Sequence, residues 1–216
     1  MSIQNFNDIN HTFYINLQHR TDRNEHMQRQ LSLLNIPYKR FNAISMKNGA
    51  VGCSLSHLSL LNYAINNNLE HILILEDDIK FYNHTLFINQ FNKCIKNREN
   101  NWDVILLAGN NIKPYTNIDD TCIKITKCQT TTGYLVNKHY MKTLRDNIKD
   151  GIELLCKYPA SPNLYAIDQY WFKLQEKDRW FLIIPITVAQ LPGYSDIEKK
   201  NVNYIKLMAN YNKQIK

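Results

Sequence analysis

The chain has 216 residues, of which 44% are hydrophobic and 11% aromatic; this composition excludes a disordered chain and predicts one folded domain with a sizeable core. Lys and Arg number 26 against 19 Asp and Glu, and the net charge of +7 favours anionic partners such as nucleotide phosphates. The basic residues are scattered rather than grouped in a block, so we expect no nucleic-acid partner.

The sequence carries no targeting signal that we recognise. The stretch MSIQNFNDINH lacks the basic and then apolar layout of a signal peptide, and no run approaches the roughly 18 apolar residues of a membrane span. Five cysteines, an odd number without Cys/His spacing typical of zinc, are expected to be free thiols and small core residues. These features predict a cytoplasmic protein without a membrane span, or one of the host cytoplasm or virion if a virus encodes it.

The first third of the chain alternates strand and helix patterns. A strand is predicted at 12–17, a helix over 21–34 with Thr21 as a candidate cap, and a short strand at 38–41. A loop, MKNGAVG, follows at 46–52. Ser54 then opens a helix whose apolar residues recur every three and four positions.

The alternation continues to the end of the chain. The continuous apolar run Ile72–Leu75 predicts a strand covered on both faces. The remaining predictions are a helix at 84–96, a strand at 102–109, a polar loop at 110–121, an edge strand or hairpin arm at 122–128, a strand at 133–137, a helix at 138–148, a turn at 150–151, a helix at 165–175 and a last strand at 180–185.

Strands alternating with helices predict an α/β fold around a mostly parallel sheet, in which ligands bind at the carboxyl ends of the strands. Glu76, Asp77 and Asp78 directly follow the apolar run, at such an end. In an extended chain Glu76 and Asp78 share one face, and two oxygen donors there suit Mg²⁺ or Mn²⁺. The alternative is a solvated strand end or a helix cap.

Two further segments carry candidate ligand-binding residues. YINLQHRTDR places Asn16 and Leu17 at a strand end, with Arg20 and Arg23 just beyond it. An Arg guanidinium can bind a phosphate through two hydrogen bonds, and backbone groups at a strand end can pair with a base edge. The alternative is a surface loop whose arginines pair with the acids beside them. In GCSLSH, small residues permit close backbone approach, and a helix N-terminus favours an anion.

Ser56 and His57 of GCSLSH are the candidate contacts at that helix start. His57 can bond a substrate or orient a loop, and the alternative is a purely structural histidine.

Five stretches in this order, YINLQHRTDR, GCSLSH, ILILEDDI, WDVILLAG and TGYLVNKHY, resemble the family 25 glycosyltransferases. That family includes lipooligosaccharide galactosyl- and glucosyltransferases and collagen hydroxylysine galactosyltransferases, and the similarity covers most of the chain. It implies a GT-A-type fold as a single domain over 1–216, with a nucleotide-binding half at about 10–110 and an acceptor half at about 111–216.

The resemblance also implies a reaction. A hexose, galactose or glucose, moves with inversion from a UDP-sugar to a hydroxyl of a glycan, lipooligosaccharide or collagen-like acceptor, with Mn²⁺ (or Mg²⁺) at the acidic motif. Asp78 is then the expected metal ligand, Glu76 a second ligand or a ribose contact, and Asp77 a further donor-side residue. The ion stabilises the charge that develops on the departing diphosphate.

An inverting transfer needs a base that takes the proton of the acceptor hydroxyl. Asp168 is the candidate, because it is a lone carboxylate among apolar and aromatic residues, where burial raises a pKa. The alternative is a carboxylate that bonds within its own helix, and Asp196 is the second candidate for the base or a late metal ligand.

A polar loop entering a strand, TTTGYLVNK, offers Thr132, Gly133 and Tyr134, with Thr131, as residues that line the donor sugar; the alternative is an ordinary turn. A non-catalytic GT-A-like module that binds glycans or nucleotides is the alternative function. The intact acids at 76–78 argue against it. Neither the oligomeric state nor the choice between galactose and glucose follows from the sequence.

Overall fold

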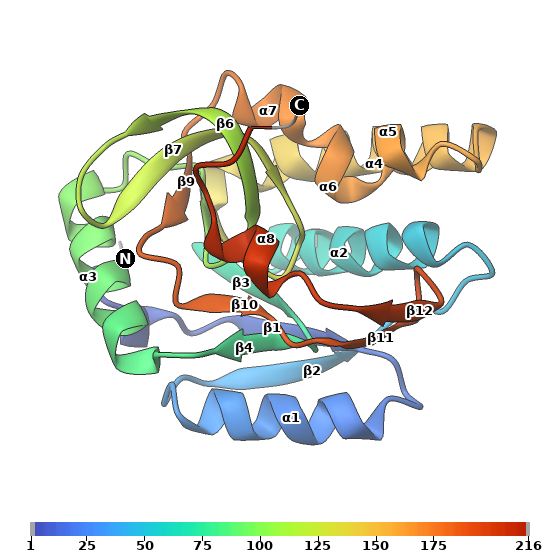
Figure 1. The fold of residues 1–216 in the computed structure, drawn as a ribbon, viewed down its shortest axis with the longest axis horizontal. Helices are drawn as coiled ribbons and strands as arrows, with labels where there is room; N and C mark the ends of the chain where they lie inside the picture. The colour runs from blue at the N-terminus through green and yellow to red at the C-terminus, as the bar shows by residue number, and fades with distance from the viewer. Residues whose placement is uncertain (1–2, 215–216) are drawn as a thin grey trace.

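The computed structural model describes residues 3–214, and its centre is an eight-stranded sheet with helices on both faces (Figure 1). The strands of this sheet are β1 (Thr12–Asn16), β2 (Tyr38–Asn42), β3 (His71–Glu76), β5 (Val104–Leu106), β6 (Asn110–Asn117), β7 (Cys122–Gln129), β8 (Gly133–Asn137) and β9 (Trp180–Ile183). Two small sheets pair β4 (Ile79–Phe81) with β10 (Val188–Gln190), and β11 (Gly193–Ser195) with β12 (Lys200–Val202).

The helices and turns of helix connect these strands. They are η1 (Phe6–Asp8), α1 (Thr21–Ser32), α2 (Gly49–Asn66), α3 (His84–Arg98), η2 (Lys138–Tyr140), α4 (Met141–Lys157), α5 (Pro162–Tyr165), α6 (Ile167–Tyr170), α7 (Phe172–Gln175) and α8 (Ile205–Ala209). No helix among the described residues is long and apolar enough to cross a membrane.

The strand order of the large sheet is β2-β1-β3-β8-β5-β9-β7-β6. β1 is parallel to β2 and β3, β5 is parallel to β9, and the other pairs, β3–β8, β8–β5, β9–β7 and β7–β6, are antiparallel. Only β8 and β7 therefore run against the common direction. The predicted α/β class with a mostly parallel sheet is confirmed.

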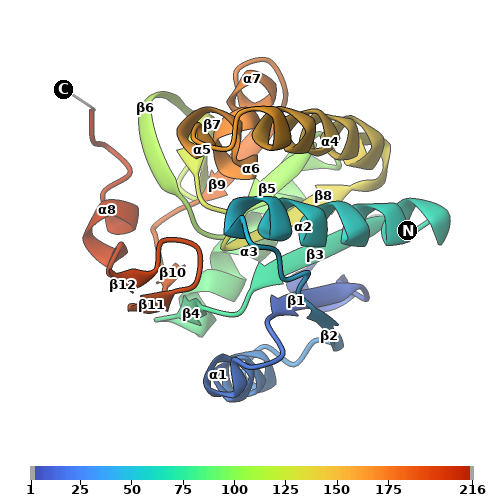
Figure 2. The ribbon, with the colours of Figure 1, turned by 90° about the vertical axis from the view of Figure 1, so that its right-hand side faces the viewer.

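The sheet separates two cores, because successive side chains of a strand point to opposite faces. In β3, Leu73 and Leu75 pack with α1 and α3, whereas Ile72 and Ile74 pack with α2 and α4, and all four are fully buried. Figure 2 shows α2 and α4 on one side of the sheet and α1 on the other. The prediction of a strand covered on both faces is confirmed.

The prediction for the start of α2 is wrong by five residues. The helix begins at Gly49 rather than Ser54, and the side chain of Asn48 caps it by accepting hydrogen bonds from the amides of Ala50 and Val51. Ala50 and Val51 are buried against Leu155 of α4, so packing extends the helix into the predicted loop.

The prediction of Thr21 as a helix cap is also wrong, since Thr21 is the first residue of α1.

Three predictions for the second half are also wrong. The expected polar loop at 110–121 contains strand β6, because it pairs with β7 as a hairpin at the sheet edge. The expected turn at 150–151 lies within α4, where Gly151 lets the ring of Tyr170 approach closely. The expected helix at 165–175 is divided into α5, α6 and α7, and β9 is not the last strand.

The cysteines are free, as expected. Cys94, Cys122 and Cys128 are buried, which confirms their assignment as core residues, but Cys156 is exposed. Cys53 is only partly buried and lies at a cavity described below.

Asp103 is the main buried charge away from that cavity. Its side chain is 6% exposed, it accepts a hydrogen bond from the backbone amide of Arg179 at 2.8 Å, and it pairs with the guanidinium of Arg179 at 2.5 Å and with His139 at 2.6 Å. Burial works to raise the pKa of Asp103, but the bonds from Arg179 and His139 outweigh it and lower that pKa below its ordinary value.

We expect Asp103→Asn to lower the free energy of unfolding at pH 7 by about 1.5–3 kcal/mol, because charged hydrogen bonds to Arg179 are lost. A lowered pKa means that this stability is present above the ordinary Asp pKa and disappears as pH falls through the folded-state value. Urea unfolding at pH 7 and at pH 3 checks this: the difference from wild type should shrink in acid. Asp146→Asn, which removes an exposed pair with Arg145, is the matched control and should cost under about 1 kcal/mol.

Candidate active site

The predicted ligand-binding segments meet at one edge of the large sheet. β1 ends at Asn16 and the neighbouring β3 ends at Glu76, with Ile15 paired to Glu76 in the ladder. β8 runs the other way and begins at Gly133, so the loop before it reaches the same edge. The placement of the acidic triplet at the carboxyl end of a buried strand is confirmed.

Two cavities, of about 310 and 340 Å³, lie side by side at this edge. Residues from the acidic motif, from α2 and from the segment around β11 line both of them: Cys53, Glu76, Asp78, Gln190, Ser195 and Ile197. The first cavity continues to residues 43–46, Leu17 and Arg23. The second continues to Thr130, Thr131 and Asp168. Leu17 thus lies where the sequence predicts a ligand contact.

Arg23 binds the acidic motif directly. Its guanidinium is 2.7 Å from a carboxylate oxygen of Asp77 and 3.1 Å from one of Asp78, and its other terminal nitrogen donates to the carbonyl of Tyr194. Asn16 donates a 2.7 Å hydrogen bond to the other carboxylate oxygen of Asp77. Asn16 and Asp77 therefore hold Arg23 at the wall of the first cavity.

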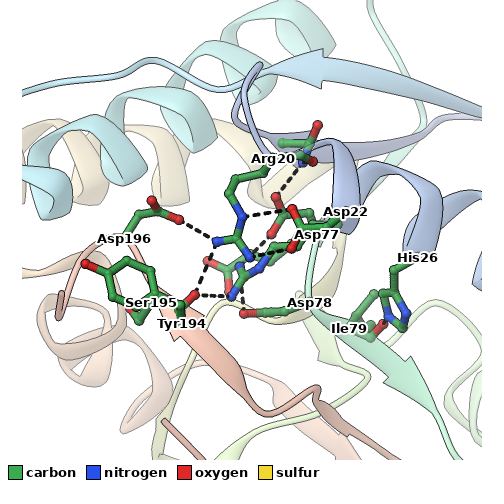
Figure 3. Close-up of polar contacts among 12 residues, drawn as sticks. Arg20, Asp22, His26, Asp77, Asp78, Ile79, Tyr194, Ser195 and Asp196 are labelled. Atoms are coloured by element: carbon green, nitrogen blue, oxygen red, sulfur yellow. Dashed lines mark hydrogen bonds and ion pairs between the residues drawn. The ribbon is translucent and has the colours of Figure 1, made fainter. Parts of the chain in front are cut away.

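Arg20 lies beside Arg23 and joins a different acid. It pairs with Asp22 at 2.9 Å and with Asp196 at 2.6 Å, and it donates to the same Tyr194 carbonyl. Figure 3 shows Arg20 between Asp22, Asp196 and the carbonyl of Tyr194. This contact ties the β11–β12 segment to the start of α1. Arg20 does not itself line either cavity.

Asp78 is a buried carboxyl group whose pKa is raised. It is 8% exposed, and its Oδ1 has no hydrogen-bond partner. Burial, together with the charge of Glu76, raises the pKa of Asp78 to about 7, although Arg23 opposes the shift. Burial also raises the pKa of Asp77. A residue that lines both cavities and has an unpaired carboxylate oxygen fits a divalent cation with oxygen ligands, because the cation would satisfy that oxygen and offset the repulsion from Glu76.

Glu76 lies between the two cavities and is surrounded by polar groups. Its Oε1 accepts a 2.6 Å hydrogen bond from the hydroxyl of Thr131, and it lies 3.8 Å from the Cys53 sulfur and 3.7 Å from His57 Nε2. Burial favours a higher pKa for Glu76, but the interactions with His57 and Thr131 lower the pKa below its ordinary value. Glu76 is therefore held as a carboxylate.

Three of the residues expected at the donor sugar do not reach a cavity. Thr132, Gly133 and Tyr134 are buried and line neither space, because Gly133 and Tyr134 belong to β8 and pair with β3. A Cβ atom at Gly133 would lie 2.7 Å from Ile79, so this glycine permits close packing. Tyr134 contacts a lining residue of the first cavity instead, since its hydroxyl is hydrogen-bonded to His57 Nδ1 at 2.7 Å.

The residues of GCSLSH support the cavity wall. Ser56 and His57 are fully buried, and both line the first cavity. Ser56 accepts a hydrogen bond from the amide of Ile44 and donates to the carbonyl of Gly52. A Cβ atom at Gly52 would lie 2.5 Å from the Ile44 carbonyl oxygen. The close backbone approach predicted here is present, and it is made with the segment 43–46.

Asp168 lies on α6 at the second cavity, away from Arg20 and Arg23. Its carboxylate accepts a 3.1 Å hydrogen bond from the amide of Thr130. Burial raises the pKa of Asp168, and the charge of Glu76 adds to the rise. Asp196 differs, because the bonds from Arg20 and His19 outweigh burial and lower its pKa.

Cys53 and Gln190 belong to the shared wall. The sequence offers Gln190 as a contact to a sugar hydroxyl or as a brace for its loop, but it does not single out Cys53 as a site residue. Cys53 is expected in the core, yet it precedes His57 by four positions, so both side chains lie on one face of α2. Gln190 comes from β10, and its Oε1 is buried without a hydrogen-bond partner. The four-residue Cys–His spacing on a helix is the signal that could have identified Cys53.

The two cavities are large enough for ligands, and they share a wall that carries carboxylates. This arrangement is typical of a group-transfer enzyme, because a donor and an acceptor can bind side by side. The comparisons with known proteins agree. The family model described as "Glycosyltransferase family 25 (LPS biosynthesis protein)" matches residues 9–50 and 45–170, and the chain belongs to this family.

Three relatives illustrate the range of the family. "Procollagen galactosyltransferase 1" of Danio rerio is 24% identical over 88% of this chain and 39% of its own length. "Lipooligosaccharide biosynthesis protein lex-1" of Haemophilus influenzae is 28% identical over 62% of this chain and 46% of its own. "Procollagen galactosyltransferase 1-B" of Xenopus laevis is 32% identical over 32% of this chain, and only 16% of its own length is spanned.

Among solved structures, a glycosyltransferase involved in glycosylation of the major capsid of PBCV-1 aligns with a TM-score of 0.43 and 11% identity. The alignment covers 88% of this chain and 96% of that one.

Proposed function

We propose that the chain is a hexosyltransferase that moves galactose or glucose from a UDP-sugar to the hydroxyl of a glycan, lipooligosaccharide or collagen-like acceptor, with inversion. The observation that carries the proposal is the pair of cavities that meet at Glu76 and Asp78. Family membership supports a nucleotide-sugar donor. The names of the relatives support galactosyl transfer and lipooligosaccharide synthesis as candidate activities.

The first cavity is the proposed donor site. Its wall combines Arg23, the segment 43–46 and Leu17, which offer a cation, backbone groups and an apolar surface to a nucleotide. Asn16 and Arg20 act indirectly in this proposal: Asn16 holds Asp77, and Arg20 holds the β11–β12 segment through Tyr194 and Asp196. This site corresponds to the predicted nucleotide-binding half at about 10–110, joined by residues of the β11–β12 segment.

Asp78, with Glu76, is the proposed holder of Mn²⁺ or Mg²⁺. The unpaired Oδ1 of Asp78 supports this assignment, because leaving a buried carboxylate oxygen without a partner is costly. Such an ion would stabilise the negative charge that develops on the diphosphate as UDP leaves. Arg23, 3.1 Å from Asp78, supplies a fixed positive charge at the same place.

The second cavity is the proposed acceptor site, and Asp168 is the proposed base. The acceptor hydroxyl gives its proton to the Asp168 carboxylate while its oxygen attacks the anomeric carbon from the side opposite to UDP. The bond from that carbon to the diphosphate oxygen breaks, and UDP departs with the electron pair. A pKa raised by burial brings Asp168 closer to the value that a general base needs.

Calorimetric titration of UDP, with and without Mn²⁺, tests the donor half of this proposal. We expect UDP to bind, Mn²⁺ to tighten the binding, and ADP or GDP to bind at least tenfold more weakly. Absence of UDP binding in the presence of either Mn²⁺ or Mg²⁺, by a chain that melts cooperatively, would contradict the assignment.

A further inference from the structure

A cysteine, a histidine and a glutamate come together at the floor of the first cavity. The ligand atoms of Cys53, His57 and Glu76 all lie within 4.8 Å of one another. Cys53 and His57 lie one helical turn apart on α2, and Glu76 ends β3. Among residues 3–214 no other group of three such side chains is as close.

The geometry points to a site for a thiophilic divalent ion, Zn²⁺, held by Cys53 Sγ, His57 Nε2 and Glu76 Oε1. Zinc bonds to sulfur, nitrogen and oxygen are about 2.3, 2.0 and 2.1 Å long. In a tetrahedral site, bonds of these lengths place neighbouring ligand atoms about 3.3–3.6 Å apart. The Glu76 oxygen lies 3.8 Å from the sulfur and 3.7 Å from the histidine nitrogen. The Cys53 sulfur and the His57 nitrogen lie within 4.8 Å of each other. Side-chain movements of up to about 1 Å therefore bring the three ligands to zinc-binding distances.

His57 gives the independent indication of a ligand. It is fully buried, its Nε2 has no hydrogen-bond partner, and its other ring nitrogen is hydrogen-bonded to the hydroxyl of Tyr134. With an ion between Nε2 and Glu76, Nδ1 carries the proton and donates it to Tyr134, and the lone pair of Nε2 binds the ion. This partner on the far nitrogen is the usual arrangement around a metal-bound histidine, where it fixes the tautomer and the ring.

Charge and access also suit zinc. The thiolate of Cys53 and the carboxylate of Glu76 together balance a doubly charged ion, and the thiol proton leaves to water when the sulfur coordinates. All three side chains line the first cavity, so an ion can enter from solvent and a water molecule can fill the fourth position. A sulfur and an imidazole favour zinc over Mn²⁺, which prefers oxygen ligands such as those of Asp78.

The proposed zinc site is distinct from the oxygen-ligand site at Asp78 but shares Glu76 with it. A zinc ion here would connect α2 to the end of β3, and through Tyr134 to β8. Zinc binding therefore stabilises the folded chain in proportion to its occupancy.

Binding of Co²⁺ and of Zn²⁺ alone, without nucleotide, tests the inference. We expect one tightly bound ion per chain, a thiolate-to-cobalt absorption band in the near ultraviolet, and a melting temperature that zinc raises by several degrees. Cys53→Ser should abolish the band and weaken zinc binding at least tenfold, and Cys156→Ser, at an exposed position, should change neither. Tyr134→Phe, which removes the partner of Nδ1, should weaken zinc binding about tenfold.

Two results would overturn the inference: a wild-type cobalt complex without a thiolate band, or zinc binding by Cys53→Ser as tight as that of wild type. If Cys53→Ser does not fold, His57→Gln replaces it in the zinc titration. The wild-type cobalt spectrum decides the question without any variant.

Discussion

Asp78→Asn is expected to lower the turnover of the sugar nucleotide by about 10²–10³-fold, because it removes the proposed ligand of the cation that would stabilise the negative charge developing on the diphosphate. The variant should not lose activity through unfolding. Burial and Glu76 raise the pKa of Asp78 from its ordinary 3.8 to about 7. Between these values the folded chain holds a proton that the unfolded chain has released, so stability falls as pH rises.

The amide that replaces the Asp78 carboxyl does not titrate, and the variant should therefore lose stability less steeply than wild type between pH 4 and pH 7. Thermal unfolding across this range and initial rates at pH 7.5 measure the two effects. Asp146→Asn, at the exposed pair with Arg145, is the control for rate. A fully folded Asp78→Asn chain with a wild-type rate would remove Asp78 from the mechanism.

Asp168→Asn is expected to slow transfer to the acceptor by about 10²–10⁴-fold while leaving the affinity for UDP within about twofold of wild type. The reason is that Asp168 lines the second cavity, and the proposed donor contacts lie in the first. Burial raises the pKa of Asp168, and only the ionised form can accept a proton. The wild-type rate should therefore rise with pH through this raised pKa, and the variant should lose that rise.

Asp196→Asn is the matched comparison, because Asp196 is the second candidate for the base. Its carboxylate is already bound to Arg20 at 2.6 Å and its pKa is lowered, which makes it a weaker proton acceptor. We expect Asp196→Asn to raise the donor KM more than it lowers kcat. The reverse outcome, in which Asp196→Asn abolishes the pH dependence and Asp168→Asn does not, would exchange the two roles.

The local sequence pattern predicts an element correctly where the residues of that element alone determine its structure. The run Ile72–Leu75 predicts a doubly covered strand because no polar residue interrupts it, and the acids that follow must then lie at the strand end. The start of α2 escapes prediction because the burial of Ala50 and Val51 depends on α4, which is about 100 residues away in the sequence. β6 escapes it because pairing with β7, rather than its own polar sequence, makes it a strand.

At the site too, the sequence predicts which residues take part but not the contacts that depend on tertiary packing. The sequence predicts Arg23, Asp77, Asp78 and Asp168 as polar residues near strand ends or within apolar surroundings. It does not show that Arg23 binds both Asp77 and Asp78, since that contact depends on the angle between α1 and the end of β3. For Tyr134, strand alternation and the pairing of β8 with β3 direct the side chain to His57 instead of a cavity.

The most direct test of the proposed function is release of UDP from a panel of UDP-sugars by the wild-type chain and by Asp78→Asn, each with and without Mn²⁺ and with a hydroxyl-bearing glycan acceptor. We predict release from UDP-galactose or UDP-glucose that requires the ion and falls at least about 100-fold in the variant. UDP binding without release from any donor, with every acceptor tried, would contradict transfer and support a module that only binds nucleotides.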